Sequence, residues 1–355
     1  IDPKCAFYLE LSDVKTKVVY LVFRATDTKA VYPVNMQRSM ILARKAGRLL
    51  KKGRRYMASH GVKALVVKTA GKIAGLRKAP VSYDKWLPKH LPTAAQLARQ
   101  REMEFAVHPK ISIVVPLYRT PKPYLAQLIQ SVKDQTYTNW ELCLSDGSGG
   151  DSPLKETLQR YQKEDERIRV VFHQESLKIA ENTNAAIEAA TGEWIAFADH
   201  DDVLTPDALF CCVKELNEQP QTEIIYSDED KMSMDGNKFF QPHFKPDYNP
   251  DLLCTVNYIC HLLVVKRSVI ERAGMMRPEY DGAQDYDFIF RCVETSQNIR
   301  HIPRILYHWR SHESSTSENP ESKLYAFDAG ARAVQAHYDR LGIRAEVTKG
   351  EYLGL

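Results

Sequence analysis

The residues with the clearest capacity for chemistry are Asp199-His-Asp201-Asp202, which directly follow the apolar run 194–197. An apolar run that ends at acids is typical of a buried strand that delivers charge to the edge of a sheet. Because side chains alternate along a strand, we expect Asp199 and Asp201 to point the same way. A divalent cation relieves the repulsion between two such carboxylates. We therefore interpret the group as a metal site. The alternative is a helix cap, which needs only one acceptor, and Thr205 can supply it.

Two further groups follow predicted strands. Tyr118 stands after 111–117, where its ring could stack on a nucleobase, and Asp146 opens the glycine-rich turn 146–150. This turn lacks the pattern of a phosphate-binding loop, but its carboxylate can accept a hydrogen bond from a base or a ribose. An ordinary turn is the alternative for both groups. A third acidic run, 227–231, is interpreted as a solvated loop.

The last third of the chain adds two more candidate groups. Asp285 and Asp287 open an amphipathic segment, where acids also complement a helix dipole. Farther on, His308 and His312 flank Arg310. Two histidines around an arginine suit a metal-bound phosphate, since the guanidinium binds phosphate oxygens in a fixed geometry. A zinc site is disfavoured because the two histidines follow a strand without an H-E-x-x-H arrangement.

Strand and helix patterns alternate from residue 111 onward, which predicts an α/β, Rossmann-like fold with a mostly parallel sheet and flanking helices. The predicted strands are 111–117, 141–145, 168–173, 194–198, 223–227 and 259–266. The predicted helices are 123–134, 153–164, 179–190 and 206–218. A second part, 268–342, is expected to hold a helix, a strand at 300–307 and a closing helix. Right-handed crossovers would bring all the carboxyl ends, and with them the acids, to one edge of the sheet.

The N-terminal part has a different character. We expect residues 1–34 to hold a strand left from an upstream domain, 35–92 to be a basic helical extension with a linker, and 93–345 to form the main domain. Between residues 35 and 79 there are 13 Lys or Arg and no Asp or Glu. This segment is interpreted equally well as a helical arm or as a surface for anionic lipid headgroups. Nucleic acid is disfavoured because no aromatic residues interleave with the charges.

Composition excludes several classes of protein. With 44% hydrophobic and 26% charged residues among 355, the chain has an ordinary globular composition. It has no run of 18 apolar residues, so no membrane span is expected. Its seven cysteines form no C-x-x-C pair, which argues against a disulfide framework or a structural zinc and favours a reducing compartment.

From residue 111 to about 341, the chain resembles family-2 glycosyltransferases with the GT-A fold. The residues that carry this resemblance are, in order, Ile113-Val-Val-Pro116-Leu-Tyr118, Ser145-Asp146-Gly-Ser148, Asn184 before Ala190-Thr-Gly192-Glu, Asp199-His-Asp201-Asp202 and Gln284-Asp285-Tyr-Asp287. The segment His308-Trp-Arg310-Ser-His312 further resembles bacterial members that build surface polysaccharides of the rhamnan or O-antigen type. Some of these carry two such modules, and we expect this chain to be one module of a larger protein.

The resemblance implies an inverting enzyme that uses Mn²⁺ or Mg²⁺. Such an enzyme moves a sugar from a UDP-, dTDP- or GDP-linked donor to a glycan or lipid-linked acceptor, in the cytoplasm at the inner face of the plasma membrane. The general base it implies is Asp285. The donor-binding residues it implies are Pro116, Tyr118, Asp146, Asn184, Asp199 and Arg310. The metal ligands it implies are Asp199, Asp201, His308 and His312.

Two positions depart from the family pattern. Ser145 and Gln284 stand where the family more often has acids. The first departure bears on base recognition, and the second is expected to lower the pKa of Asp285 by removing a like charge. Two alternatives stay open: a nucleotidyltransferase on a similar scaffold, which needs no acceptor base, and a non-catalytic module that binds nucleotide sugars.

Overall fold

The computed structural model describes residues 18–25, 28–35, 81–311 and 324–348 and divides the chain into two compact units, 1–81 and 82–355. In the first unit, β1 (Val18–Ala25) pairs antiparallel with β2 (Thr28–Asn35). The sequence predicted β1 but not its partner β2. Of the basic segment, residues 36–79 lie outside the described residues.

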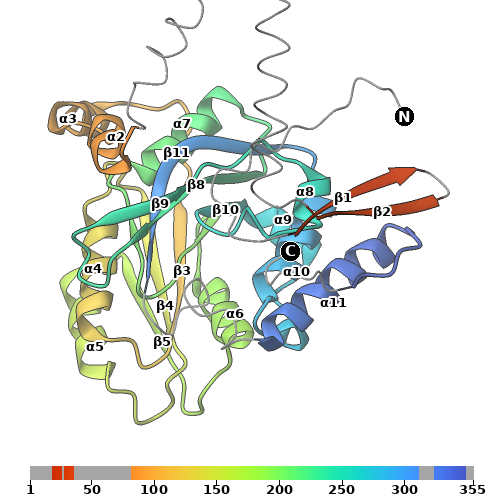
Figure 1. Cartoon of the computed structure of the whole chain (residues 1–355). Coiled ribbons are helices and arrows are strands. Elements are labelled where there is room, and N and C mark those ends of the chain that lie inside the picture. Colours follow the sequence, from red (N-terminus) through yellow and green to blue (C-terminus); the bar gives the residue numbers. More distant parts are fainter. Residues whose placement is uncertain (1–17, 26–27, 36–80, 312–323, 349–355) are drawn as a thin grey trace, which may run out of the picture. The chain divides into compact units, whose positions relative to one another are not determined.

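The second unit is built around one sheet (Figure 1), which has nine strands in the described part of the chain. They are β3 (Ile111–Leu117), β4 (Trp140–Asp146), β5 (Ile168–Phe172), β6 (Trp194–Phe197), β7 (Val203–Leu204), β8 (Ile224–Met232), β9 (Phe239–His243), β10 (Leu263–Lys266) and β11 (Ile299–Arg310). Their order is β5-β4-β3-β6-β10-β8-β11-β7, with β9 paired to β8. The predicted α/β architecture with a mostly parallel sheet is confirmed.

One strand reverses direction inside this sheet. β3, β4, β5 and β6 are parallel, but β10 runs antiparallel to β6 on one side and to β8 on the other. Leu263 at the start of β10 lies opposite Phe197, the last residue of β6. This corrects the expectation that all strands end at one edge. The residues just before β10 therefore reach the edge where β6 ends.

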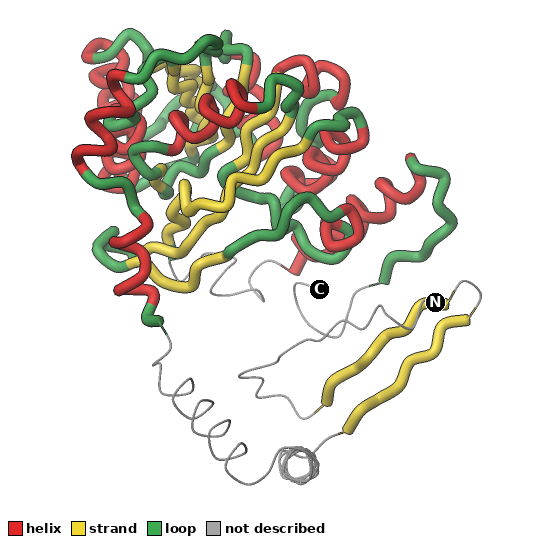
Figure 2. The backbone as a smooth tube through the Cα atoms, turned by 90° about the horizontal axis from the view of Figure 1, so that it is seen from above, coloured by secondary structure: helices red, strands yellow, loops and turns green. Residues whose placement is uncertain are grey.

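Helices cover both faces of the sheet (Figure 2). They are α2 (Tyr83–His90), α3 (Ala94–Glu102), α4 (Lys122–Lys133), α5 (Lys155–Glu164), α6 (Ile179–Ala189), α7 (Ala208–Glu218), α8 (Pro250–Leu253), α9 (Arg267–Ala273), α10 (Gln284–Glu294) and α11 (Leu324–Arg340), with a 3₁₀ turn η1 (Pro278–Tyr280). Apolar residues of α4, α5 and α7 join one core cluster, and those of α6, α9, α10 and α11 join the other. Among the described residues, no helix combines the length and apolar character that crossing a bilayer needs.

The expectation of a linker within 35–92 is also corrected, at residues 81–92. Most of this stretch forms α2, which belongs to the second unit. The Tyr83 hydroxyl hydrogen-bonds to Asp230 at 2.5 Å, and the Trp86 ring meets Phe244 edge-on. These aromatic contacts favour a docked helix over an extended linker.

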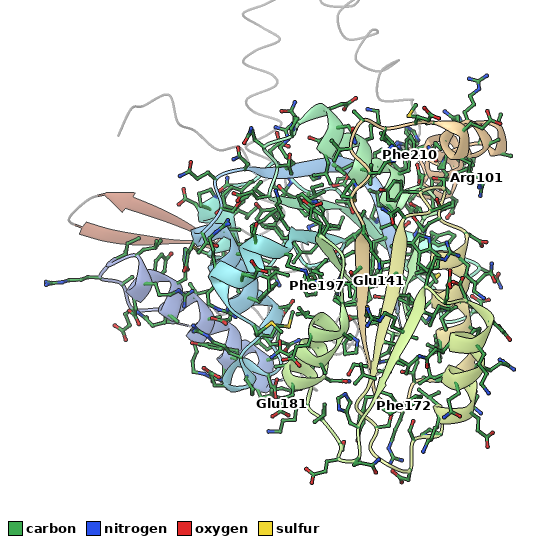
Figure 3. The ribbon with its side chains drawn as sticks, turned by 180° about the vertical axis from the view of Figure 1, so that it is seen from behind. Arg101, Glu141, Phe172, Glu181, Phe197 and Phe210 are labelled. Carbon is green, nitrogen blue, oxygen red and sulfur yellow. The ribbon has the colours of Figure 1, made fainter. Side chains whose placement is uncertain are left out.

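A buried carboxylate near the start of β4, that of Glu141, ties neighbouring strands together (Figure 3). Glu141 on β4 accepts hydrogen bonds from Ser112 of β3 and from Thr191, and it pairs with Lys110 at 2.7 Å. Burial alone would raise the pKa of Glu141, but these partners lower it to about 2. At Gly192, a side chain would approach Ser112 Oγ within 2.5 Å. The glycine of the Ala190-Thr-Gly192 motif is thus required by close packing.

Candidate functional site

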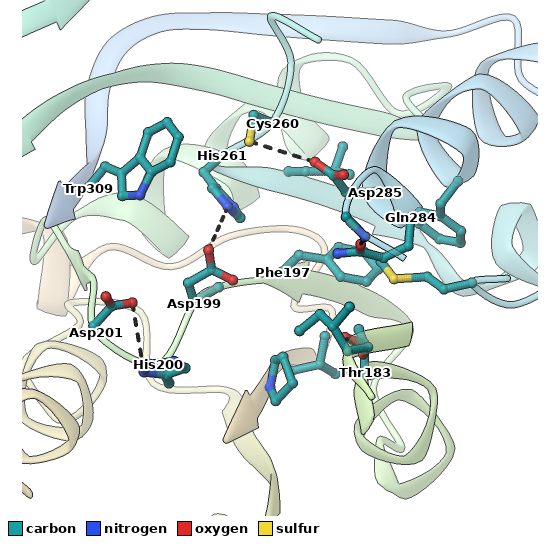
Figure 4. A pocket seen from close by; sticks show the side chains of 18 of the residues that line it. Thr183, Phe197, Asp199, His200, Asp201, Cys260, His261, Gln284, Asp285 and Trp309 are labelled. Atoms are coloured by element: carbon teal, nitrogen blue, oxygen red, sulfur yellow. Dashed lines mark hydrogen bonds and ion pairs between the residues drawn. The ribbon is translucent and has the colours of Figure 1, made fainter. Parts of the chain in front are cut away.

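A cavity of about 1120 Å³ lies where β3 and β6 end and β10 begins (Figure 4). Its lining brings together four of the residues predicted from the sequence, namely Pro116, Asp199, Asp201 and Asp285. Figure 4 shows Asp201 and Trp309 on one side, Asp199 and His261 in the middle, and Asp285 on the other side. The cavity is large enough to enclose a ligand of nucleotide size.

The third acid of the 199–202 group anchors its loop. Asp202 is fully buried, and its carboxylate accepts hydrogen bonds from the Tyr307 hydroxyl at 2.6 Å and the Arg310 backbone N–H at 2.7 Å. Burial raises the pKa of Asp202, and the charges of Asp201 and Asp199 raise it further. With Asp202 held by β11, the loop presents Asp199 and Asp201 to the cavity.

Asp199 and Asp201 fit a divalent cation that is shared with a ligand. Both line the cavity, and the Asp199 side chain is 45% exposed. Mg²⁺ and Mn²⁺ prefer such oxygen ligands, and Mg²⁺ sites commonly use one or two carboxylates together with substrate phosphates. Among the described residues, no cluster of three or more His, Cys, Asp or Glu forms an all-protein site. The residues present therefore suit a cation that needs phosphate oxygens to complete its coordination.

Asp285, on the first turn of α10, lines another part of the same cavity. Its Oδ2 accepts a hydrogen bond from Asn257 Nδ2 at 2.8 Å and lies 3.9 Å from Cys260 Sγ. Burial raises the pKa of Asp285, and the nearby His261 opposes the shift without cancelling it. Gln284 adds no like charge beside Asp285, and its effect on this pKa relative to an acid at the same position stays a prediction. A carboxylate with a raised pKa is suited to accepting a proton near neutral pH.

His261 joins the two groups of acids, and the sequence did not predict it. Its Nε2 lies 3.3 Å from Asp199 Oδ2, and its ring stacks on Tyr307 with centroids 4.8 Å apart. Trp309 meets the same ring edge-on and also lines the cavity. A lone histidine before an apolar run carries no sequence signal. Only the reversed direction of β10 reveals its position.

Residues 112–273 match the family model described as glycosyl transferase family 2. The chain contains a family-2 glycosyltransferase domain. The matched residues include the 199–202 group and His261, whereas Asp285 lies beyond them.

Two curated relatives and a solved structure show how this glycosyltransferase domain compares with known proteins. Uncharacterized protein y4gI of Sinorhizobium fredii is 43% identical over 234 residues, covering 65% of this chain and 26% of that protein. O-antigen biosynthesis protein RfbC of Myxococcus xanthus is 32% identical over 282 residues, covering 78% and 22%. The chain thus spans about a quarter of the length of these relatives. S. aureus TarS 1–349, in complex with UDP-GlcNAc, has a TM-score of 0.53 at 18% identity over 67% of this chain and 68% of that one. This likeness confirms the GT-A fold.

The prediction that His308 binds the metal is corrected by its place on β11. Its Nδ1 hydrogen-bonds to Asp230 at 2.5 Å, and its ring packs against Phe239. Because side chains alternate along β11, Trp309 faces the cavity whereas His308 faces away. His312 lies outside the described residues, so its assignment stays a prediction.

Arg310 was predicted to bind the donor, but its side chain is buried and supports the loop 199–202. Its Nε donates to the Asp201 carbonyl at 2.6 Å, while its two terminal nitrogens donate to the Met234 carbonyl and to Gln127 Oε1. The guanidinium also lies over the ring of Tyr124. A buried arginine with these partners holds the loop in shape and has little capacity left for a diphosphate.

The residues predicted to recognise the nucleobase lie at the ends of β3 and β4. Tyr118 is 53% exposed, and Asp146 is buried. The Asp146 carboxylate accepts hydrogen bonds from the Ser148 backbone N–H and the Ser152 hydroxyl, so it already shapes its own turn. Neither residue lines the cavity. Their contact with a base stays a prediction.

Asn184 on α6 bonds to the protein's own backbone. Its side-chain amide donates to the Met276 carbonyl at 2.8 Å and accepts from the Met276 N–H at 2.9 Å. These two hydrogen bonds fix the chain ahead of α10. Asn184 does not line the cavity, and its contact with a donor stays a prediction.

The acidic run expected to be a solvated loop is instead a buried part of β8. Asp228 accepts from the Lys245 backbone N–H and pairs with His301, each at 2.8 Å. Glu229 pairs with the Lys245 ammonium at 3.3 Å, and Asp230 is held by His308. Each acid has a specific partner, which makes its burial tolerable.

The raised pKa of Asp285 predicts an effect on stability. Because the pKa is higher in the folded state, ionisation costs folding free energy, and this cost grows as pH rises through the folded-state pKa. We expect Asp285→Asn to be more stable than the parent at pH 8, with the difference shrinking as pH falls through the folded-state pKa and lost below about pH 4. Thermal unfolding across this range measures it. Asp251→Asn, at an exposed acid on α8, should show no such gain. Equal unfolding temperatures for Asp285→Asn and the parent at pH 8 would contradict the raised pKa of Asp285 in the folded state.

Proposed function

We propose that the chain is an inverting, metal-dependent glycosyltransferase. It would transfer a hexosyl or deoxyhexosyl group from a nucleoside diphosphate sugar to a hydroxyl of a glycan or lipid-linked acceptor in bacterial surface polysaccharide synthesis. One observation carries the proposal: a single cavity holds two acids suited to a cation, Asp199 and Asp201, and a third acid with a raised pKa, Asp285. A metal held by acids assists the departure of a diphosphate, and a positioned carboxylate assists the attack of a hydroxyl, so both kinds of acid suit one reaction centre.

The donor half is assigned to the loop after β6. Asp201, helped by Asp199, would hold Mn²⁺ or Mg²⁺. The bound cation would neutralise the charge that develops on the departing diphosphate. Pro116 lines the same cavity, and Tyr118 and Asp146 are proposed to reach the nucleobase beyond it. The structural neighbour TarS favours this half, since it was solved in complex with UDP-GlcNAc.

The acceptor half is assigned to α10. Asp285 would accept the proton of the acceptor hydroxyl while that oxygen attacks the anomeric carbon from the face opposite the diphosphate. A single displacement of this kind inverts the anomeric centre. Burial of Asp285 favours the role because it raises the pKa of the carboxyl toward the pH of the medium.

The polysaccharide assignment rests on the relatives. RfbC of Myxococcus xanthus is named for O-antigen biosynthesis, and a 28% identical relative from Escherichia coli is named chondroitin synthase. Both names refer to the synthesis of polysaccharides. UDP-, dTDP- and GDP-linked sugars are therefore the donors to test first, and a thermal-shift panel of these with Mn²⁺ identifies the donor.

Substitution of the acids separates the proposed roles. Asp285→Asn should lower turnover by about 10²–10⁴-fold, since a positioned general base contributes about that much. It should leave Mn²⁺-dependent binding of the nucleoside diphosphate nearly intact. Asp201→Ala should weaken that binding itself. Calorimetry and the release of nucleoside diphosphate measure the two effects, with Asp251→Asn as the matched control.

Other outcomes would support the alternatives. Full release of the nucleoside diphosphate by Asp285→Asn would contradict the assigned base. Release of pyrophosphate from a nucleoside triphosphate and a sugar phosphate would favour a nucleotidyltransferase. Metal-dependent binding without turnover in the unmodified chain, with every donor and acceptor supplied, would favour a non-catalytic module.

We also propose that the enzyme acts in the cytoplasm, at the inner face of the plasma membrane, through the basic segment 35–79. Its 13 Lys or Arg without an acid would attract anionic headgroups at about 1 kcal/mol per residue near the surface. Flotation with phosphatidylglycerol liposomes should recover the chain at low salt and lose it as salt rises. Neutral phosphatidylcholine liposomes are the control. No recovery with anionic liposomes would favour the helical-arm interpretation.

A further inference from the structure

A short stretch of chain connects the two proposed halves of the reaction. Residues 257–261, here called the bridging segment, run from α8 to the start of β10. Because β10 is antiparallel to β6, this segment arrives at the edge of the sheet where the 199–202 loop leaves. Cys260 and His261 both line the cavity. None of these residues has a role in the proposed chemistry so far.

One end of the bridging segment holds the proposed base. Asn257 Nδ2 donates to Asp285 Oδ2 at 2.8 Å, and Cys260 Sγ approaches the same oxygen at 3.9 Å. Asn257 Oδ1 in turn accepts from the Cys260 backbone N–H at 3.4 Å, which closes the segment on itself. Both contacts to Asp285 engage the same oxygen, Oδ2, and this orients the carboxylate. The segment does not engage the other oxygen, Oδ1.

The other end holds a donor-side acid. His261 Nε2 lies 3.3 Å from Asp199 Oδ2, and the histidine ring stacks on Tyr307. The Tyr307 hydroxyl itself accepts from the Asp199 backbone N–H at 3.0 Å and donates to Asp202. The position of Asp199 is thus fixed at its side chain by His261 and at its backbone by Tyr307.

A buried ion pair between Lys245 and Glu229 holds the bridging segment in place. Lys245 is buried, and its ammonium donates to the carbonyl of Ile259 at 2.9 Å and to the carbonyl of His261. The same ammonium pairs with Glu229 of β8 at 3.3 Å. A lysine charge removed from water is tolerated only with such partners. The segment is therefore anchored to the sheet rather than left as a surface loop.

We propose that the bridging segment sets the geometry between donor and acceptor, with Asn257 as the positioning residue for Asp285 and His261 as the positioning residue for Asp199. The inference rests on the proposed function. Transfer requires the attacking oxygen and the anomeric carbon to be about 3–3.5 Å apart, and a misplacement of about 1 Å can cost about 10²-fold in rate. Contacts that support a metal ligand typically contribute about 10–100-fold in metal affinity or activity, and we expect a loss of similar size for the contact that positions the base.

The two ends predict opposite kinetic signatures. Asn257→Ala should lower kcat for nucleoside diphosphate release by about 10–100-fold. Its Kd for UDP, GDP and dTDP, each measured with Mn²⁺, should stay within about twofold of the parent value. His261→Phe keeps an aromatic ring against Tyr307 but removes the nitrogen that faces Asp199. It should weaken the Mn²⁺-dependent Kd by about tenfold, with a smaller effect on kcat at saturating donor.

Thr255→Val is the matched control, because Thr255 lies just before the bridging segment, is exposed and bonds only to Leu252 in the described structure. It should leave kcat, Kd and the unfolding temperature unchanged. Unchanged kcat in Asn257→Ala would overturn the proposal. So would a joint loss of donor affinity and unfolding temperature in that variant, which would indicate a merely structural residue.

Failure of the role proposed for the bridging segment can be distinguished from failure of the proposed function. If Asp285→Asn abolishes turnover and Asp201→Ala abolishes Mn²⁺-dependent binding, but Asn257→Ala is neutral, the bridging segment alone loses its role. If the parent chain binds none of the three nucleoside diphosphates, the proposed function falls and the inference falls with it.

Discussion

The direction of one short strand determines the composition of the site. β10 is inserted antiparallel between β6 and β8, so its first residues, rather than its last, reach the edge where β6 delivers its acids. This arrangement places His261 beside Asp199 and brings Asn257 to Asp285. A parallel β10 would have sent the same residues to the far edge of the sheet. The chemical relation between the two halves of the cavity depends on this reversal.

The domain separates acids that stabilise the structure from acids that face the cavity. Asp202 and Glu229 are buried and matched to donors or cations, which offsets the cost of removing their charge from water. Asp199 and Asp201 instead line the cavity on a loop that Asp202 anchors. Stability and reactivity are thus assigned to neighbouring carboxylates of the same loop. Their environments, more than their residue type, determine which role each takes.

Much of the fold could be predicted from the sequence because it depends on local patterns. The buried strands read as apolar runs, and the acids at the end of β6 identified the edge that carries the cavity. The pairing partners could not be predicted in the same way. The side of β11 on which His308 lies, and the burial of 228–230 within β8, depend on the register of strands distant in sequence. Helix α2 could not be predicted because its Tyr83 and Trp86 contact β8 and a residue just after β9, which are distant in sequence.

The most direct test of the account is a crystal structure of the chain with Mn²⁺ and the nucleotide sugar that stabilises it most. The account predicts an anomalous manganese peak within coordinating distance of Asp201 and a diphosphate bound to it. The sugar should lie between that peak and the Asp285 carboxylate. A manganese peak or a sugar located away from these two acids would contradict the account.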